Sequence, residues 1–349
     1  DLEIQLSITK SSIKNDFENQ INILRQVHQA NLFKLLVQDH GNKWSIQELS
    51  EQMSNLADVI IDTTLFCVWK SYFPSDKFPK IAVIAFGKLG SKEFGFASDL
   101  DLIFLTKTIQ DHNYSTYIKI IKRFISWLSV STSAGSLFSI DLRLRPNGNS
   151  GLLVTSLESF HEYQKNKAWL WEHQAVSRSR FCAGNREIGE TFEEIRSSIL
   201  QIRRSPQKLT EEIISMRNKI TSSYETKPKL FDIKYDNGGM IDIEFITQAT
   251  VLRYATYHES FCQNIGTINL LNDFASKKVL PESLTIKVAN IYAEYRTIQH
   301  KYRLKGEKNV KVDFENFKIQ RNYVNQLWKK VFKNAPVNIR NLSDLNSEK

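Results

Sequence analysis

The chain has 349 residues, a formal net charge of +9, and a composition that is 41% hydrophobic and 24% charged. This length exceeds one ordinary domain core, so two or three domains are expected. No stretch reaches the roughly 18 uncharged apolar residues of a membrane-spanning helix, and the first residues lack the charged-then-apolar form of a signal peptide. We therefore expect a soluble, cytoplasmic protein with no membrane partner.

The first residue and the cysteines give two further expectations. The chain begins with Asp1 rather than methionine, which suggests a piece of a longer protein. Its cysteines, at positions 67, 182 and 262, are far apart and lack the spacing of a metal site, so we expect reduced thiols. The positive charge is spread along the chain without the interleaved aromatic residues of a nucleic-acid groove, so we expect no nucleic-acid partner.

The amino-terminal part, up to about residue 70, has the pattern of helices. Apolar residues at helical spacing predict one helix within residues 17–40. Ser45 and Glu48 have the spacing of a capping box, in which each caps the other at a helix start. A second helix is therefore predicted directly after Ser45.

The pattern changes after residue 80. Short β-rich runs predict strands at residues 81–86, 99–106 and 137–144, and apolar spacing predicts a helix at 117–130 between the last two. Strands that alternate with helices indicate an α/β unit of roughly 100 residues.

Helical patterns return from about Leu157, and the segment SPQK at 205–208 is a plausible joint before an all-helical tail. One long helix in this tail has a face built from Leu284, Val288, Ile291, Tyr295, Ile298 and Tyr302. Its aromatic residues are interpreted as packing in a bundle core. The expected domains are a helical segment at 1–75, the α/β unit at 76–204 and a helical bundle at 205–349.

Three aspartates form a candidate site. Side chains alternate across a strand, so Asp99 and Asp101 point to one face, and Asp141, Arg143 and Arg145 share a face of the strand at 137–144. If these strands are neighbours, Asp141 comes within reach of the pair. Three carboxylates are the oxygen environment that Mg²⁺ prefers when it also carries substrate phosphates.

A glycine turn lies about ten residues before the aspartates. Gly87 and Gly90 would let the backbone approach a triphosphate closely, with Lys88 meeting the anionic oxygens. The structural alternative is that Asp99 and Asp101 are a salt-bridged or turn-forming pair. A P-loop is excluded, because GKLGSK has the wrong spacing.

At this point the sequence resembles a known family. The turn, the D-x-D pair and the later Asp are similar to the polymerase β type of nucleotidyltransferase. The segments GKLGSKEFGFASDLDLIF, DLRLRPNGNSGLLVTSLESFHEYQ, AWLWEHQAVSRSR and FDIKYDNGGMIDIEFITQ resemble the glutamine synthetase adenylyltransferase family. The resemblance runs from about Val83 to Phe332. It implies an α+β fold with a nucleotidyltransferase domain flanked by helices and followed by an all-helical bundle.

The resemblance also implies residue roles and partners. Asp99 and Asp101 would bind the catalytic metals, two Mg²⁺ ions, and Asp141 would complete the site. The remaining residues of the nucleotide site would be Gly87, Lys88, Ser98, Arg143 and Arg145. Ser98 would give its hydroxyl to phosphate or merely cap the strand. The implied partners are glutamine synthetase, a PII-type regulatory protein and the other half of a two-half enzyme.

Four further polar residues occur in the resembling segments. Glu172 and His173 are interpreted as tying their helix to an arginine, with Arg143, Arg178 and Arg180 as the available partners. Asp242 and Glu244 stand at a probable helix start, where acidic side chains suit the helix dipole. A contact of Glu244 with nucleotide or with the catalytic domain is left open.

The expected reaction is transfer of AMP from ATP to a tyrosine of glutamine synthetase, with release of pyrophosphate. Two segments, AWLWEHQAVSRSR and FDIKYDNGGMIDIEF, resemble the adenylylating, carboxyl-terminal half of the family. Three alternatives remain: phosphorolytic removal of AMP, nucleotide transfer to nucleic acid, and a non-catalytic module that binds nucleotide.

Overall fold

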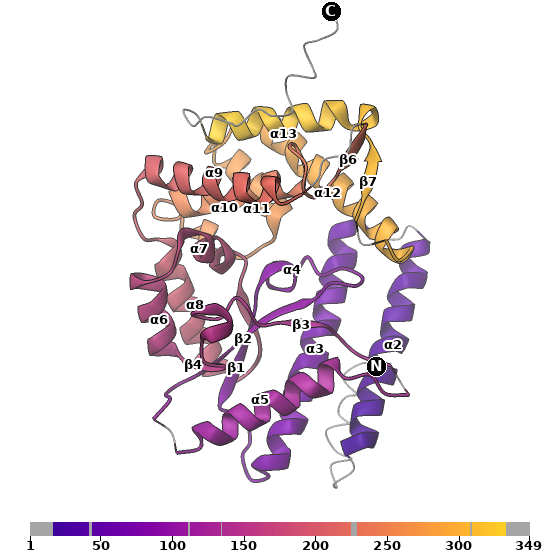
Figure 1. The fold of residues 1–349 in the computed structure, drawn as a ribbon, viewed down its shortest axis with the longest axis vertical. Helices are drawn as coiled ribbons and strands as arrows, with labels where there is room; N and C mark the ends of the chain where they lie inside the picture. The colour runs from indigo at the N-terminus through magenta and orange to yellow at the C-terminus, as the bar shows by residue number, and fades with distance from the viewer. Residues whose placement is uncertain are drawn as a thin grey trace, which may run out of the picture. The chain divides into compact units, whose positions relative to one another are not determined.

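The computed structural model describes residues 17–41, 44–110, 112–133, 135–224, 229–307 and 309–332 (Figure 1). The chain separates into two compact units. The first unit is Asp1–Gln201 with Cys262–Gly266, and the second is Ile202–Phe261 with Thr267–Lys349. The domain limits expected after residues 75 and 204 stay predictions, and the chain ends at 1–16 and 333–349 lie outside the described residues.

The first unit combines helices with a mixed sheet. Its elements are α2 (Phe17–His40), α3 (Ile46–Tyr72), β1 (Ile81–Ala85), α4 (Gly87–Gly90), β2 (Leu100–Thr106), α5 (Tyr114–Ser129), β3 (Ile140–Asp141), the 3₁₀ turn η1 (Gly148–Ser150), β4 (Val154–Ser156), α6 (Leu157–Asn166), α7 (Leu170–Ser177), β5 (Arg180–Gly184) and α8 (Arg186–Leu200). This mixture of helices and strands confirms the α+β class. The nucleotidyltransferase topology stays a prediction.

Strand β2 organises the sheet, whose order is β3-β2-β1-β5. It pairs antiparallel with β1, and β1 pairs antiparallel with β5. The other side of β2 pairs in parallel with β3 at its start and with β4 at its end. The predicted strands at 81–86 and 99–106 are therefore confirmed as β1 and β2.

The strands β1 and β2 are buried on both faces, which explains their nearly continuous apolar sequence. One face packs with α2, α3 and α5 in a core that includes Ile60, Val83 and Phe104. The rings of Phe104 and Phe124 meet edge to face, with centroids 5.7 Å apart. Helix α8 packs against β1 and β5.

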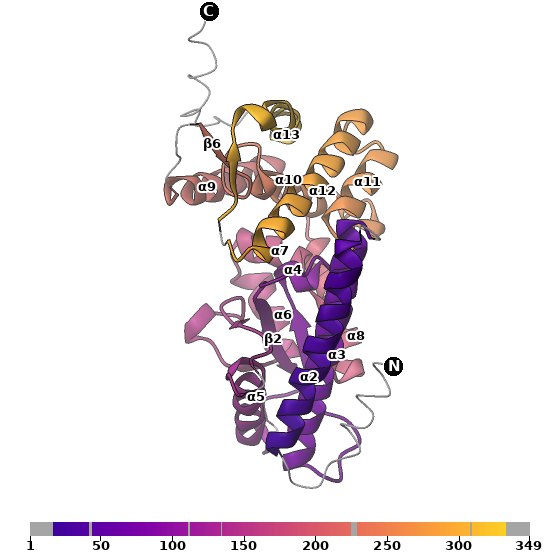
Figure 2. The ribbon, with the colours of Figure 1, turned by 90° about the vertical axis from the view of Figure 1, so that its right-hand side faces the viewer.

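The two amino-terminal helices are confirmed, and Figures 1 and 2 show α2 and α3 side by side. The capping box predicted for α3 is also present. The Ser45 hydroxyl accepts a hydrogen bond from the Glu48 N–H at 3.3 Å, and the Ser45 N–H donates to Glu48 Oε2 at 2.8 Å. The predicted helix at 117–130 is confirmed as α5.

The third predicted strand, at 137–144, is wrong in extent. Only Ile140 and Asp141 form β3, and the chain then turns. The reason is local, because Asp141 Oδ1 accepts a hydrogen bond from the Arg143 N–H at 2.9 Å. A side chain that captures the backbone two residues ahead favours a turn over a continued strand.

The second unit is mainly helical. Its elements are α9 (Pro206–Ser222), β6 (Leu230–Asp232), α10 (Met240–Tyr254), the 3₁₀ turn η2 (Glu259–Cys262), which ends in the first unit, α11 (Thr267–Ser276), α12 (Glu282–Leu304), β7 (Lys311–Asp313), the 3₁₀ turn η3 (Glu315–Phe317) and α13 (Lys318–Val331).

The expectation of an all-helical bundle is corrected by an antiparallel pair, β6 and β7. Its middle residue Phe231 is fully buried and packs near Tyr295 and Phe317. The aromatic residue Tyr295 on α12 is thus part of the core, as the sequence indicated. Apolar contact with helices is enough to stabilise this short two-stranded sheet.

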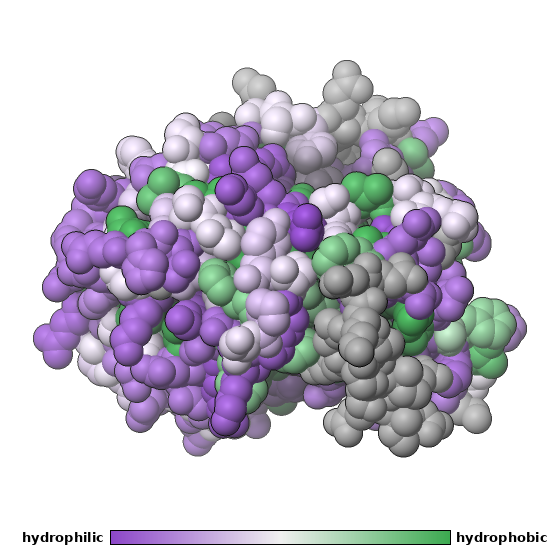
Figure 3. All heavy atoms as spheres, turned by 90° about the horizontal axis from the view of Figure 1, so that it is seen from below, coloured by the Kyte–Doolittle hydropathy of each residue, from purple (hydrophilic) through white to green (hydrophobic). Residues whose placement is uncertain are grey.

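The exterior is polar on the face drawn in Figure 3, where hydrophilic side chains predominate and hydrophobic ones are scattered in small groups. Among the described residues, no helix combines the length and apolar character needed to cross a bilayer.

Candidate active site

The sheet brings two of the three aspartates together. Asp101 on β2 and Asp141 on β3 stand directly opposite each other in the parallel register. A backbone hydrogen bond of 2.8 Å from Leu100 N–H to the Ser139 carbonyl fixes this pairing. Asp99 precedes β2 and is exposed. The condition stated for Asp141, that the two strands are neighbours, is therefore met.

The negative charges of Asp99 and Asp141 both act on the carboxyl group of Asp101. Burial, together with the negative charges of Asp141 and Asp99, raises the pKa of Asp101 to about 6, against the opposing effect of Arg178 and Arg143. Carboxylates that share a site disfavour each other's ionised form. The site thus concentrates negative charge where a cation would be stabilising.

Arg143 holds Asp141 in the structure. The Arg143 side chain donates to both oxygens of Asp141, with Nε at 3.0 Å from Oδ1 and 2.9 Å from Oδ2. These hydrogen bonds lower the pKa of Asp141 and raise the pKa of Arg143, to which the charges of Asp101 and Asp99 also contribute. The Arg143 side chain is nevertheless 73% exposed.

Position 87 must be glycine because a side chain there would collide with Asp101. Its φ is +58°, a region that favours glycine. A Cβ at this position would lie 2.3 Å from Asp101 Oδ2. The glycine therefore makes room for the carboxylate itself, a role that the sequence interpretation of a phosphate-binding turn missed.

A hydrogen-bonded chain supports this turn from behind. The Ser91 hydroxyl donates to the Gly87 carbonyl at 3.0 Å, and Arg178 Nε donates to Ser91 Oγ at 2.9 Å. The other end of Arg178 forms a buried ion pair with Glu93 at 2.7 Å. Since Arg178 also lowers the pKa of Asp101, it links the turn to the acidic site.

Two residues expected at the phosphates serve the scaffold in the structure. A Cβ on Gly90 would lie 2.0 Å from the Arg178 carbonyl, so Gly90 permits close backbone packing. Arg145 donates to the carbonyls of Leu142, Asn149 and Gly151 at 2.9 to 3.2 Å, which organises the turn after β3. The expectation that Arg145 shares a strand face with Asp141 is wrong, because the strand ends first.

Lys88 and Ser98, which are also expected to contact phosphate, follow Gly87 closely in the sequence. Lys88 is half-buried on α4. Ser98 is half-buried, and its N–H donates to the Gly95 carbonyl at 3.1 Å, which closes the turn before Asp99. Their contacts with a nucleotide stay predictions.

Glu172 and His173 have structural partners in α6 and at the start of α7. Glu172 accepts hydrogen bonds from the Tyr163 hydroxyl at 2.9 Å and from the Trp169 N–H at 2.8 Å. His173 Nε2 lies 2.8 Å from the Gln164 carbonyl. Both side chains are buried and hold α7 against α6.

Asp242 does more than cap a helix. It is buried and forms an ion pair with Arg217, and its second oxygen accepts the Gly238 N–H at 2.6 Å. Glu244 accepts a hydrogen bond from the Tyr292 hydroxyl at 2.9 Å, inside the second unit. A contact of Glu244 with nucleotide stays open.

The acidic site fits a magnesium ion by its chemistry. Its donors are carboxylate oxygens, and burial together with repulsion from Asp141 and Asp99 raises the pKa of Asp101, so a divalent cation would stabilise the ionised carboxylates. Among the described residues, no group of three or more His, Cys, Asp or Glu side chains is already arranged around a metal position. Arg143 occupies both oxygens of Asp141 instead.

Comparison with known proteins identifies the family. A family model described as glutamate-ammonia ligase adenylyltransferase matches residues 3–195. The chain belongs to this family. That match includes β1, β2, β3 and the three aspartates.

Curated relatives in the glutamate-ammonia ligase adenylyltransferase family extend the similarity. The chain is 41% identical over 324 residues to a bifunctional glutamine synthetase adenylyltransferase/adenylyl-removing enzyme of Bordetella bronchiseptica, covering 92% of this chain and 34% of that protein. A protein of the same name from Aromatoleum aromaticum is 39% identical over 335 residues, covering 96% of this chain and 36% of the relative. The chain therefore spans about a third of the length of these relatives.

Proposed function

We propose that this chain transfers AMP from ATP to a tyrosine of glutamine synthetase and releases pyrophosphate. The observation that carries the proposal is the pairing of Asp101 with Asp141 beside Gly87, in a chain of this family. The names of the relatives support the substrate and the reaction. The fold of the first unit would then be a polymerase β-like nucleotidyltransferase domain.

Asp99, Asp101 and Asp141 would hold Mg²⁺. The ion would supply charge neutralisation at the phosphates and activation of a tyrosine hydroxyl whose pKa is otherwise near 10. Asp141 is better suited to be an anionic ligand than a proton acceptor, because its lowered pKa weakens it as a base.

The cationic residues would act on the triphosphate. Arg143 is exposed, so it can leave Asp141 and pair with phosphate oxygens when the carboxylate binds a cation. Lys88 on α4 would offset phosphate charge, and the Ser98 hydroxyl would add a hydrogen bond. The hydrogen bonds from Arg178 to Ser91 and from Ser91 to the Gly87 carbonyl would keep Gly87 in place while these contacts form.

The resemblance implies further partners. In the full-length enzyme, a second half and a PII-type regulatory protein would act on this unit, and the reaction would take place in the cytoplasm. These partners are part of the proposal.

One incubation tests the function. The chain, Mg²⁺ and ATP labelled at the α-phosphate are mixed with glutamine synthetase or with an oligonucleotide, and the Asp101→Asn variant serves as the inactive control. We expect label on glutamine synthetase alone, at a tyrosine. Label on the oligonucleotide would indicate a nucleic-acid enzyme, and ATP binding without transfer would indicate a non-catalytic module.

A further inference from the structure

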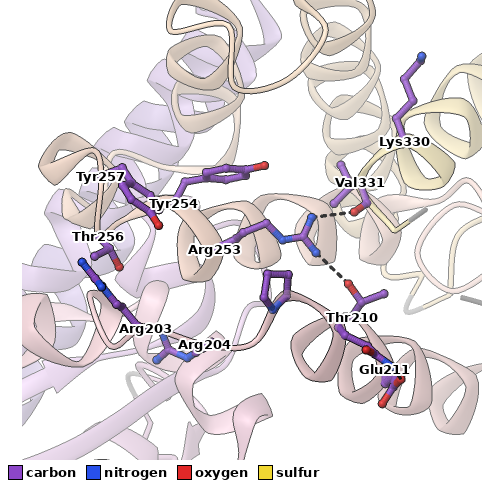
Figure 4. Close-up of a pocket in the computed structure, with 12 residues that line it drawn as sticks. Arg203, Arg204, Thr210, Glu211, Arg253, Tyr254, Thr256, Tyr257, Lys330 and Val331 are labelled. Carbon is purple, nitrogen blue, oxygen red and sulfur yellow. Dashed lines mark hydrogen bonds between the residues drawn. The ribbon is translucent and has the colours of Figure 1, made fainter. Parts of the chain in front are cut away.

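The second unit contains a cavity of about 890 Å³ (Figure 4). Its walls come from the segment before α9, from the first turns of α9, from the end of α10 with the following turn, and from the last turn of α13. A volume of this size is within the usual range for small-molecule sites. The aspartates discussed above belong to the other compact unit, and none of the residues that line this cavity is among the proposed catalytic residues.

The lining of this cavity is cationic. Arg203, Arg204, Arg253 and Lys330 contribute positive charge, and Glu211 is the acidic residue among the lining side chains. Glu211 accepts a hydrogen bond from Gln207 at 2.9 Å. Pro206 and Gln207 of the first turn of α9 also line the cavity, and a helix amino terminus adds partial positive charge.

Arg253 lies between helices and is held by neutral oxygens. Its guanidinium donates to the Val331 carbonyl at 2.9 Å and to the Thr210 hydroxyl at 2.8 Å, as the dashed lines in Figure 4 show. Both acceptors are uncharged. Arg253 Nε is buried and has no hydrogen-bond partner among the described residues. A buried, unsatisfied donor on a charged group is unfavourable unless a ligand completes it.

Arg204 also donates hydrogen bonds to backbone carbonyls in this cavity. It donates to the carbonyls of Ile202 at 2.8 Å and Leu252 at 3.4 Å. Burial lowers the pKa of Arg204 to about 10, which still leaves it charged at neutral pH. The Arg253 guanidinium, bound to neutral oxygens in a cavity that Arg203, Arg204 and Lys330 also line, favours an incoming anion.

We propose that this cavity binds a phosphorylated small molecule of nucleotide size. Guanidinium groups match phosphate oxygens in a two-point geometry. Tyr254 lines the cavity at the end of α10, and Tyr257, which is 70% exposed, lies at its rim. These rings supply flat surfaces for a planar base, while the arginines contact the phosphate.

Calorimetry with AMP tests the proposal, with EDTA present to weaken binding at the metal-dependent site. Adenosine is the uncharged counterpart, and inorganic phosphate and a glutamate-rich peptide are further probes. We expect AMP to bind at least about tenfold more tightly than adenosine, because charge-assisted hydrogen bonds carry the affinity. Hydrogen exchange with bound AMP should show protection at 203–211 and 253–257.

Matched variants locate the site. Arg203→Gln with Lys330→Gln removes two exposed cations from the cavity, and Arg186→Gln with Lys165→Gln removes two exposed cations from the first unit. The cavity variant should weaken AMP binding at least tenfold, whereas the control should bind as the original chain does. Both should retain AMP transfer, which separates this proposal from the proposed catalytic function.

Four results would overturn the inference. These are no AMP binding at millimolar concentration, equal binding of adenosine, equal loss in both variants, and protection confined to residues 87–101. Binding of the peptide without binding of AMP would also reject a phosphorylated small molecule and indicate a protein partner.

Discussion

The contact between Gly87 and Asp101 links a backbone conformation to the acidic site. We predict that Gly87→Ala reduces AMP transfer at least tenfold, because the new Cβ would lie 2.3 Å from Asp101 Oδ2 and displace it. The matched control is Gly306→Ala, since Gly306 also has a positive φ but a Cβ added there would meet no described atom within 4 Å. Both changes should lower stability by about 1–2 kcal/mol.

Thermal melts and transfer rates of the two glycine variants distinguish the effects. If the Gly306→Ala variant loses as much transfer as the Gly87→Ala variant, backbone strain explains the loss and the contact with Asp101 does not.

The crowding of carboxylates gives a second prediction. Asp101→Asn should reduce transfer by more than a hundredfold, since even changes in groups that only orient metal ligands reduce activity by about 10- to 100-fold. Its melting temperature should stay equal or rise, because the substitution removes repulsion with Asp141 and Asp99. Turnover near that of the original chain would exclude Asp101 as a metal ligand.

At the scale of single residues, the sequence indicated where a side chain lies when that side chain follows the regular alternation of a strand. Alternation along strands gave the faces of Asp101 and Asp141, and it placed them within reach of each other only if their strands were neighbours, a condition that the structure meets. It did not predict that Asp141 turns the chain and binds Arg143, because alternation describes a continued strand and takes no account of a side chain that bonds the backbone two residues ahead. The support of Gly87 by Arg178 is equally a long-range contact.

At the element scale, strands with mixed composition were the ones that sequence reasoning missed. The strand β5 reads RFCAG and is only partly buried, so it lacks both alternation and an apolar run. It forms because β1 offers an antiparallel edge and because Asp58 on α3 pairs with Arg180 at 2.7 Å. Tertiary contacts therefore select a strand that local propensity does not favour.

The Arg178–Glu93 pair joins the end of α7 to the loop after α4, and a double-mutant cycle tests its role. Arg178→Gln or Glu93→Gln alone should destabilise the fold by about 3–5 kcal/mol, because each leaves a buried charge unpaired. The double variant should regain much of this stability. Transfer should stay low in the variants that lack Arg178, because Ser91 loses its support.

Denaturant unfolding and transfer assays on the same four proteins give the comparison. Recovery of transfer together with stability in the double variant would mean that the pair acts on folding alone.

His28 on α2 gives a prediction for pH. It is buried against Phe138, with ring centroids 4.8 Å apart, and burial lowers its pKa to about 4 from 6.5. The folded state therefore binds this proton less well than the unfolded state. The stability contributed by neutral His28 is fully present above pH 6.5 and is lost as the pH falls toward 4, by an amount of order 3 kcal/mol.

His28→Leu should flatten the pH dependence of unfolding between pH 6.5 and 4 relative to the original chain. Denaturant melts in matched buffers measure this difference. An identical slope in both proteins would show that other groups control acid sensitivity.

At the scale of the whole molecule, the two segments that indicate the direction of the reaction lie in different units. AWLWEHQAVSRSR forms α7 and supplies Arg178 to the first unit, while FDIKYDNGGMIDIEF forms β6, the following turn and the start of α10 in the second. In the proposed function, the same acidic site would serve both addition and removal of AMP, so the three aspartates do not distinguish the two directions. The resemblance of these two segments to the adenylylating half is what favours addition.

The final prediction is that the chain adds AMP rather than removes it. With ATP, Mg²⁺ and unmodified glutamine synthetase, mass spectrometry should show a gain of one AMP per subunit at a tyrosine. With adenylylated glutamine synthetase and inorganic phosphate, the chain should release little ADP, since the two segments resemble those of the adenylylating half. Efficient phosphorolysis without AMP addition would assign the chain to the removing half. That result would not contradict the proposed role of the acidic site, because the same site would serve both directions.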